Sequence, residues 1–299
     1  MTFEDIAHGH RYVVIHEDDV GMTHGANIAF AELSALGTCS SGSVMVPCPW
    51  FAEAAELAAA NPALDIGVHL TLTSEKKPYR WRPLTSPPAS AGLTDRMGCF
   101  WPDVPNVRRH AAPDAVEAEL RAQIDTAIAA GFDLTHLDSH MGTVMCPEFV
   151  DIYVRLGIDY QLPILLVRDY NTFNPCSYSG PLSNERYDAA LATVQARGFP
   201  VFEMVYETPW QRTTDAESAY GEIFRSIPAG LTFLSLHFNA PGDFEVIEPA
   251  MAHIRTDEYA LFRTPRIGEW VRENGLEVIG LRDLRDRLRA GWAARGAVR

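Results

Sequence analysis

Basic residues are scarce in this chain of 299 residues. It carries 25 lysines and arginines against 39 aspartates and glutamates, which gives a formal charge of −14 at pH 7. Nucleic acids and anionic membranes bind basic surfaces, so this balance argues against both as partners. The shares of hydrophobic residues (47%) and charged residues (21%) are usual for a globular protein and exclude wholesale disorder.

Cysteines and long apolar segments are also few. The five cysteines, at positions 39, 48, 99, 146 and 176, form no Cys-x-x-Cys pair. We therefore predict neither a disulfide framework nor a thiolate zinc site. Apolar runs such as residues 162–167 are far shorter than the roughly 20 residues that a membrane span needs. Residues 1–6 contain acids where an export signal has a basic run, so we expect a cytoplasmic protein.

Short apolar runs rich in β-branched residues alternate with helical patterns along the whole chain. Several of these runs are apolar on both faces, as in a parallel sheet that helices cover. The pattern predicts an α/β fold, specifically an irregular TIM-like (β/α) barrel with about seven or eight parallel strands. The predicted strands are 12–16, 43–46, 66–72, 134–138, 164–167, 201–205, 232–237 and 277–280.

Helix signals and loop composition indicate a single barrel domain over residues 1–299. Helices are expected at 24–36, 50–60, 113–130 and 257–274, the last with a kink or break at Pro265. Two insertions interrupt the alternation. Residues 74–110 are rich in proline and aromatics, and residues 169–185 are polar and aromatic. Loops of this length inside a compact domain are usually functional when they are ordered.

Acidic and imidazole side chains follow several of the predicted strands. In a parallel barrel, catalytic groups lie at the carboxyl ends of the strands. Asp18 and Asp19 follow the first strand, and both can face one site only if the chain bends there, which Gly21 would permit. His69 alternates with apolar residues in the third strand, and His237 closes a later one.

A third group of polar residues lies at the end of the fourth predicted strand. The two-residue period of a strand places His136, Asp138 and His140 on one face. One carboxylate with two imidazoles is a common site for Zn²⁺, Fe²⁺, Co²⁺ or Mn²⁺, or for Mg²⁺ with more water ligands. Such a site can polarise a carbonyl and acidify a bound water, while a further carboxylate and histidine act as base and acid.

Three motifs, in this order along the chain, resemble those of the YdjC-type carbohydrate deacetylases. The likeness covers nearly the whole chain, including a modified His-Pro-Gly at 237–242 and the stretch 255–259. The motifs are Asp-Asp-x-Gly at 18–21, Gly-x-His-Leu-x-Leu-Thr at 67–73 and His-x-Asp-Ser-His at 136–140.

The resemblance implies a TIM-like barrel that removes the acetyl group from a small-molecule N-acetylated carbohydrate. It implies that Asp19, His69 and His140 bind one divalent metal ion. Zinc is the first choice, with magnesium, manganese and cobalt as alternatives. It further implies that Asp18 is the general base and His237 the general acid.

Other residues are expected to support this chemistry. His136 and Asp138 are candidates to orient the metal ligands or to bind substrate. Tyr79, Trp81 and Trp101 are candidates to stack on a sugar ring. The chain departs from the family at residues 16–17, where His-Glu replaces the usual Asn-Ala, and at 142, where Gly replaces a histidine. These changes affect the rim of the pocket. The sequence is also compatible with a homo-oligomer.

Several other functions are compatible with the same residues. His136 and Asp138 with another histidine also resemble a non-haem Fe(II) oxygenase site, although such sites are usual in all-β barrels. Another metallohydrolase or a sugar isomerase could use the same barrel, because a fold does not determine a reaction. A sugar-binding protein without turnover is a further alternative, which the intact Asp18–Asp19 pair disfavours.

Overall fold

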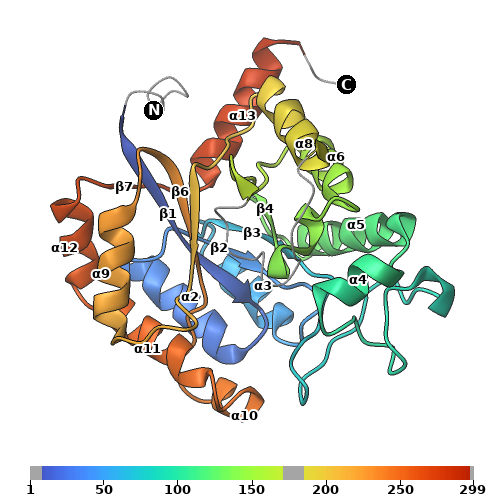
Figure 1. The fold of residues 1–299 in the computed structure, drawn as a ribbon, viewed down its shortest axis with the longest axis horizontal. Coiled ribbons are helices and arrows are strands. Elements are labelled where there is room, and N and C mark those ends of the chain that lie inside the picture. The colour runs from blue at the N-terminus through green and yellow to red at the C-terminus, as the bar shows by residue number, and fades with distance from the viewer. Residues whose placement is uncertain (1–8, 171–184, 297–299) are drawn as a thin grey trace.

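The centre of the molecule is a curled parallel sheet surrounded by helices (Figure 1). The structure is a computed structural model that describes residues 9–170 and 185–296. The sheet has seven strands in the order β4-β3-β2-β1-β6-β5, and β7 pairs with β1. This arrangement confirms the predicted α/β fold of the irregular TIM-like type. The strands are β1 (Arg11–Val20), β2 (Ser41–Val44), β3 (Ile66–Leu70), β4 (Leu137–Ser139), β5 (Met204–Glu207), β6 (Gly230–Leu236) and β7 (Glu277–Val278).

The predicted strand at 164–167 is not a regular strand. Its residues form only isolated bridges, from Leu137 to Ile164 and from Val167 to Phe202. Pro163 lies directly before it and has no N–H to donate to a ladder. The segment nevertheless lies between β4 and the residues that precede β5. It therefore connects the two edge strands of the curled sheet.

The three helices predicted at 24–36, 50–60 and 113–130 begin and end within one residue of those positions, whereas the helix predicted at 257–274 begins earlier, at Ala252. The predicted break at Pro265 is present, because one helix ends at Phe262 and the next begins at Arg266. The helices are α2 (His24–Leu36), α3 (Phe51–Ala60), α4 (Val104–His110), α5 (Pro113–Ala129), α6 (Val150–Tyr160), α8 (Glu185–Ala196), α9 (Ala216–Ser226), α10 (Phe244–Ile247), α11 (Ala252–Phe262), α12 (Arg266–Glu273) and α13 (Arg282–Ala294), with the 3-10 turns η1 (Ala89–Ala91) and η2 (His140–Met145).

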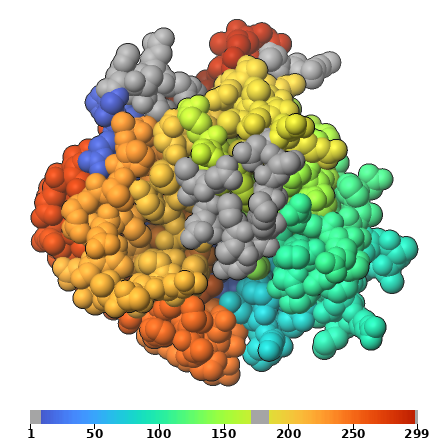
Figure 2. All heavy atoms as spheres, viewed as in Figure 1, coloured from blue at the N-terminus to red at the C-terminus, as the bar shows by residue number. Residues whose placement is uncertain are grey.

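The insertion at 74–110 is ordered and contains η1 and α4. It lies beside the α10–α11 segment on one face of the molecule (Figure 2), where Lys76 Nζ is 2.6 Å from a carboxylate oxygen of Glu248. Most of the second predicted insertion, 169–185, lies outside the described residues, and the single-domain organisation stays a prediction. Within the described ranges, no helix is both long and apolar enough to cross a membrane.

The apolar half of β1 anchors the sheet. Val13, Val14 and Ile15 are essentially unexposed, and burying each such side chain stabilises the fold by about 1.5–3 kcal/mol. β1 pairs with β6 on one side and with β2 and β7 on the other, so it is the central strand of the sheet. The polar residues at its carboxyl end are therefore carried to the middle of one end of the sheet.

Candidate functional site

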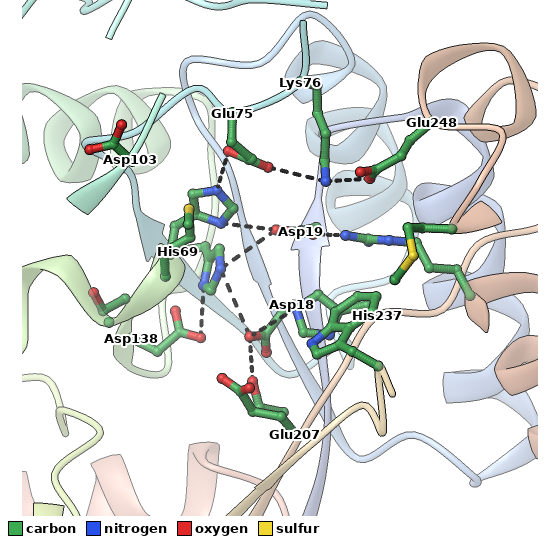
Figure 3. A pocket seen from close by; sticks show the side chains of 18 of the residues that line it. Asp18, Asp19, His69, Glu75, Lys76, Asp103, Asp138, Glu207, His237 and Glu248 are labelled. Carbon is green, nitrogen blue, oxygen red and sulfur yellow. Dashed lines mark hydrogen bonds and ion pairs between the residues drawn. The ribbon is translucent and has the colours of Figure 1, made fainter. Parts of the chain in front are cut away.

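The polar strand ends identified in the sequence meet at one pocket of about 560 Å³ (Figure 3). Asp18 and Asp19 end β1, and His69 lies in β3. His140 directly follows β4, and His237 directly follows β6. All of these side chains line the pocket, which opens at the carboxyl end of the parallel sheet.

A bend at Asp19 itself allows both adjacent carboxylates to face the pocket. Asp19 adopts a left-handed conformation with φ of 63°, and Gly21 follows with φ of 83°. The pairing register between β1 and β2 shifts in the same place, between Glu17 and Val20. Aspartate tolerates this conformation better than most residues, at a cost of about 1–3 kcal/mol. The expected bend is therefore present, and it begins two residues before Gly21.

Three side chains converge as a metal site would require. The Oδ1 atom of Asp19 is 3.2 Å from Nδ1 of His140 and 3.6 Å from Nε2 of His69. This oxygen is buried and has no hydrogen-bond partner among the described residues. One atom from each of the three residues lies within 4.8 Å of the others. A buried carboxylate oxygen without a donor, facing two imidazole nitrogens, fits a divalent cation.

In both His69 and His140, the ring nitrogen that points away from Asp19 lies next to a second carboxylate. Nδ1 of His69 lies 2.9 Å from Oδ2 of Asp138, which also accepts a hydrogen bond from Ser43. Nε2 of His140 is hydrogen-bonded to Glu75 at 3.1 Å. Metal-binding histidines usually have such partners, which orient the ring and select its tautomer. Asp138 thus lies where a residue that orients a ligand is expected.

Burial and charge set the ionisation of this cluster. Burial opposes ionisation of Asp19, but Arg255, at 2.8 Å from Oδ2, and His140 hold the pKa of Asp19 well below its ordinary value. Burial is likewise outweighed for Glu75, whose pKa is lowered to about 2 by His140 and by Lys76. For His140, burial is outweighed by Glu75 and Asp19, which raise its pKa to about 10. In the metal-free protein His140 is therefore protonated between the carboxylates of Asp19 and Glu75, and a bound cation would replace the proton on its Nδ1.

Asp18 lies beside this cluster and is held at both oxygens. Its Oδ1 is 2.6 Å from Nδ1 of His16, and its Oδ2 accepts a hydrogen bond of 2.6 Å from Ser235. The same Oδ2 is 3.9 Å from Nε2 of His69 and 3.9 Å from Nε2 of His237. Asp18 therefore lies between the metal-type cluster and His237.

His237 is oriented by a threonine and a buried glutamate. Its Nδ1 is 2.9 Å from the hydroxyl of Thr208, which donates to Oε1 of Glu258 at 2.8 Å. The Thr208 proton is committed to the carboxylate, so Nδ1 of His237 must donate and Nε2 is left without a proton. Burial, followed by the charge of Arg255, lowers the pKa of His237 to about 3. His237 is thus a neutral imidazole whose Nε2 accepts a proton.

His136 does not line the pocket. It is buried in the core, where its Nε2 is 2.9 Å from Nε2 of His16. A Cβ at position 67 would come within 2.6 Å of the His136 ring, so only glycine fits there. Its hydrogen-bond partners are His16 and Thr135, not His69 or His140, so a direct role of His136 in orienting the metal ligands stays a prediction.

The three aromatics predicted to stack on a sugar do not line the pocket either. Trp81 and Trp101 donate their indole N–H groups to backbone carbonyls, and the hydroxyl of Tyr79 donates to Met22. Their polar atoms are thus used to pack the 74–110 insertion. Among the described residues, Trp210 does line the pocket, and its ring centre lies 4.7 Å from that of His237.

Several pocket residues were missed from the sequence. Glu75 and Lys76 belong to the 74–110 insertion, whose sequence does not single them out, and Arg255 begins the stretch 255–259. Glu207 ends β5, so the rule that found the other strand ends could have found it. Burial, followed by the charge of Asp18, raises the pKa of Glu207 to about 7.

Comparison with known proteins agrees with this geometry. The family model described as YdjC-like protein matches residues 12–273, which include every strand end described above. The chain belongs to the YdjC-like family. This YdjC-like protein is 42% identical over 154 residues to a carbohydrate deacetylase of Thermus thermophilus, covering 52% of this chain and 53% of the relative.

Further relatives show the same pattern. A carbohydrate deacetylase of Thermoanaerobacter pseudethanolicus is 30% identical over 154 residues, which are 52% of this chain and 59% of the relative. The chain spans about half the length of the curated relatives it matches. A crystal structure of an Enterococcus faecalis V583 protein, described as a proposed cellobiose-phosphate cleavage protein, has a TM-score of 0.73 at 22% identity. It covers 92% of this YdjC-like chain and 99% of its own, and shows a shared fold.

The partner of His140 gives a first prediction. Glu75→Gln is expected to weaken metal binding about 10- to 100-fold, as is usual for a residue that orients a ligand. In the metal-free protein, the lowered pKa of Glu75 means that its ionised form stabilises the fold above the ordinary value of 4.5. This stabilisation is lost as pH falls toward 2. The stability difference between wild type and variant should therefore shrink over that range.

Metal titration and urea unfolding at several pH values measure both effects. Glu56→Gln, on the exposed face of α3, is the matched control. Metal affinity that is equal in the two variants would contradict the role of Glu75.

Proposed function

We propose that this chain removes the acetyl group from an N-acetylated sugar and that it needs a divalent cation to do so. The observation that carries the proposal is the convergence of Asp19, His69 and His140, with Asp18 and His237 at its side. The relatives named carbohydrate deacetylases support the substrate class. A pocket of about 560 Å³ has the size of a small-molecule site.

Asp19, His69 and His140 would hold the cation, oriented by Asp138 and Glu75. When bound, a divalent ion supplies Lewis acidity that polarises the amide carbonyl and lowers the pKa of a water. The ion would be zinc in the first instance, because two imidazoles and one carboxylate are typical of catalytic zinc. Magnesium, manganese and cobalt accept the same ligands.

Asp18 would act as the general base. Its carboxylate lies next to the metal-type cluster and faces the pocket, so it can take one proton from the attacking water. The water oxygen bonds to the amide carbon, and the C–N bond then breaks. Arg255 contacts Asp19 and not Asp18, which leaves the charge of the base available for the reaction.

His237 would return that proton to the departing nitrogen. Its Nε2 is proton-free in the neutral ring and lies 3.9 Å from Oδ2 of Asp18. The proton that Asp18 takes can therefore pass to Nε2 and from there to the amine, which could not otherwise leave. Burial raises the pKa of Glu258, beyond Thr208, to about 7, and in its ionised form this carboxylate would stabilise the transient imidazolium. The second proton of the water passes from the acetic acid to the amine, so the products are acetate and the ammonium form of the amino sugar, and no proton is gained or lost overall.

A test of the activity uses the full chain, stripped of metal by a chelator. It is then offered N-acetylated mono- and oligosaccharides with zinc, magnesium, manganese or cobalt added back. The proposal expects stoichiometric release of acetate and of a primary amine, and it expects both to cease on chelation. Turnover that survives complete metal removal, or sugar isomerisation without acetate, would overturn it.

The threonine between His237 and Glu258 offers a second test. Thr208→Val removes the hydroxyl and leaves Nδ1–H of His237 without its acceptor. We expect kcat to fall about 10- to 100-fold while bound metal is unchanged. Thr208→Ser keeps the hydroxyl and should restore most of kcat. Steady-state kinetics and metal analysis of both variants measure this, and equal kcat values for the two would refute the relay.

A further inference from the structure

The described side chains that line the pocket carry an excess of negative charge. Seven of them are carboxylates, whereas lysine and arginine contribute one side chain each. Three of the carboxylates, Asp103, Glu207 and Glu248, have no part in the proposed metal binding or catalysis. Residues 171–184, which the structure does not describe, contain no lysine or arginine. A divalent ion at Asp19 would therefore compensate only part of this excess.

Both cationic side chains of the pocket already have anionic partners. Arg255 is buried and lies 2.8 Å from Oδ2 of Asp19. Lys76 lies between two carboxylates (Figure 3), with its Nζ 2.6 Å from Glu248 and 3.5 Å from Glu75. Apart from the proposed metal ion, which the acetyl group needs, a phosphate on a ligand would find no unpaired cation here. It would instead face several carboxylates that repel it.

Glu207 differs from the other carboxylates of the pocket because it has no partner. It ends β5, pairs in register with Ser235 of β6, and is partly buried at the pocket wall. Ser235 donates its hydroxyl to Asp18, and no described group donates a hydrogen bond to Glu207. A carboxylate in this position gains more from hydroxyl donors on a ligand than one that the protein already satisfies.

We infer that the pocket selects N-acetylated sugars that carry neither phosphate nor carboxylate, and that Glu207 binds their hydroxyl groups. The inference rests on the proposed function, because it names the class of sugar that the deacetylase would accept. Sugar hydroxyls donate strong, charge-assisted hydrogen bonds to a carboxylate, whereas an anionic group adds a like charge. Salt screens such repulsion, so the selectivity should decrease as ionic strength rises.

Binding measurements test this selectivity separately from turnover. The zinc-loaded full chain is titrated in a calorimeter with N-acetylglucosamine, N-acetylgalactosamine and N-acetylmannosamine, each with and without a 6-phosphate. We expect the phosphate to weaken affinity at least about tenfold. The difference should shrink when salt is raised from about 0.01 M to about 1 M. Equal or tighter binding of the phosphorylated sugars at low salt would overturn the inference.

Glu207→Gln tests the role of the unpartnered carboxylate. The amide keeps the shape of the side chain and removes its charge. We therefore expect affinity for the uncharged sugars to fall about tenfold and the penalty for phosphate to shrink. Because no described group donates to Glu207, the free energy of unfolding should not fall, as it would for a structural carboxylate. Glu56→Gln, exposed on α3, is the control. Wild-type affinity in Glu207→Gln, or a destabilised fold, would refute the assignment.

Glu248→Gln is expected to change selectivity through Lys76. It removes the nearer partner of this lysine and leaves Nζ available to an anion. We expect the phosphorylated sugars to bind about two- to fivefold more tightly, as for an exposed ion pair, while the uncharged sugars bind as before. Calorimetry on this variant measures both. An unchanged affinity for the phosphorylated sugars would contradict the argument that the pocket lacks an unpaired cation.

The failure of this inference can be distinguished from the failure of the proposed function. If the uncharged sugars bind selectively and no acetate is released, the deacetylase activity fails and the selectivity stands. If acetate is released as fast from the phosphorylated sugars, the selectivity fails and the activity stands. If none of the uncharged sugars binds, the inference is overturned whatever the acetate assay shows.

Discussion

An Asp19→Asn variant is expected to lose its divalent cation and at least about a thousandfold in acetate release. The carboxylate is the only anionic member of the Asp19, His69 and His140 cluster, and an amide is a much weaker ligand. Loss of several kcal/mol of charge stabilisation corresponds to a rate loss of this size. Metal analysis of the purified variant and the acetate assay measure the two losses.

The same substitution should also destabilise the fold in the absence of metal. Arg255 is buried and forms its ion pair with Asp19 at 2.8 Å, so removal of the carboxylate leaves a buried charge uncompensated. The expected cost in the free energy of unfolding is about 3–5 kcal/mol, measured by urea unfolding with chelator present. Asp114→Asn, at an exposed position in the first turn of α5, is the control. A variant that retains metal, activity and stability would exclude Asp19 as a ligand.

Asp18→Asn is expected to retain the metal and lose about 10²- to 10⁴-fold in kcat. Its side chain is 3.9 Å from His69 and lies outside the Asp19, His69 and His140 set, so the amide leaves those three residues intact. What is lost is the group that takes the proton from water, and general base catalysis accounts for a factor of this size.

The paired result decides between the two adjacent carboxylates. Metal content, kcat and KM are measured for Asp18→Asn beside Asp19→Asn and the Asp114→Asn control. If Asp18→Asn lost the metal while Asp19→Asn kept both metal and activity, the two roles would have to be exchanged. Retention of KM in Asp18→Asn would show that the pocket itself is intact.

The sequence could predict that the polar strand ends lie close together, because this follows from the alternation of apolar and polar residues and from the parallel pairing of the strands. The apolar run before Asp18 and the spacing around His69 each locate a carboxyl strand end, and parallel strands bring such ends to one edge. The identity of the groups that surround them could not be predicted. Glu75 and Arg255 reach His140 and Asp19 from segments far along the chain, and no local period records such contacts.

His136 shows where strand periodicity fails. The two-residue period predicts that it shares a face with Asp138 and His140, but β4 begins only at Leu137, and the turn η2 begins at His140. Asp138 therefore reaches the cluster from a strand and His140 from a turn, whereas His136 precedes the strand and packs inward against His16. The positions of the aromatics in the 74–110 insertion could not be predicted either, because a proline-rich loop has no sequence period that separates packing residues from pocket residues.

The sequence by itself determined the α/β fold, the family motifs and the four strand ends that carry acids and imidazoles, because local hydrophobic patterning dictates which segments pair and in which direction. Only the tertiary structure decided how those groups are charged and oriented. The bend at Asp19, the carboxylates behind His69 and His140, and the link from Asp18 through His16 to His136 all join residues distant in the chain. Hydrogen bonding and Coulomb interactions act through space over a few ångströms, and sequence order does not record those distances.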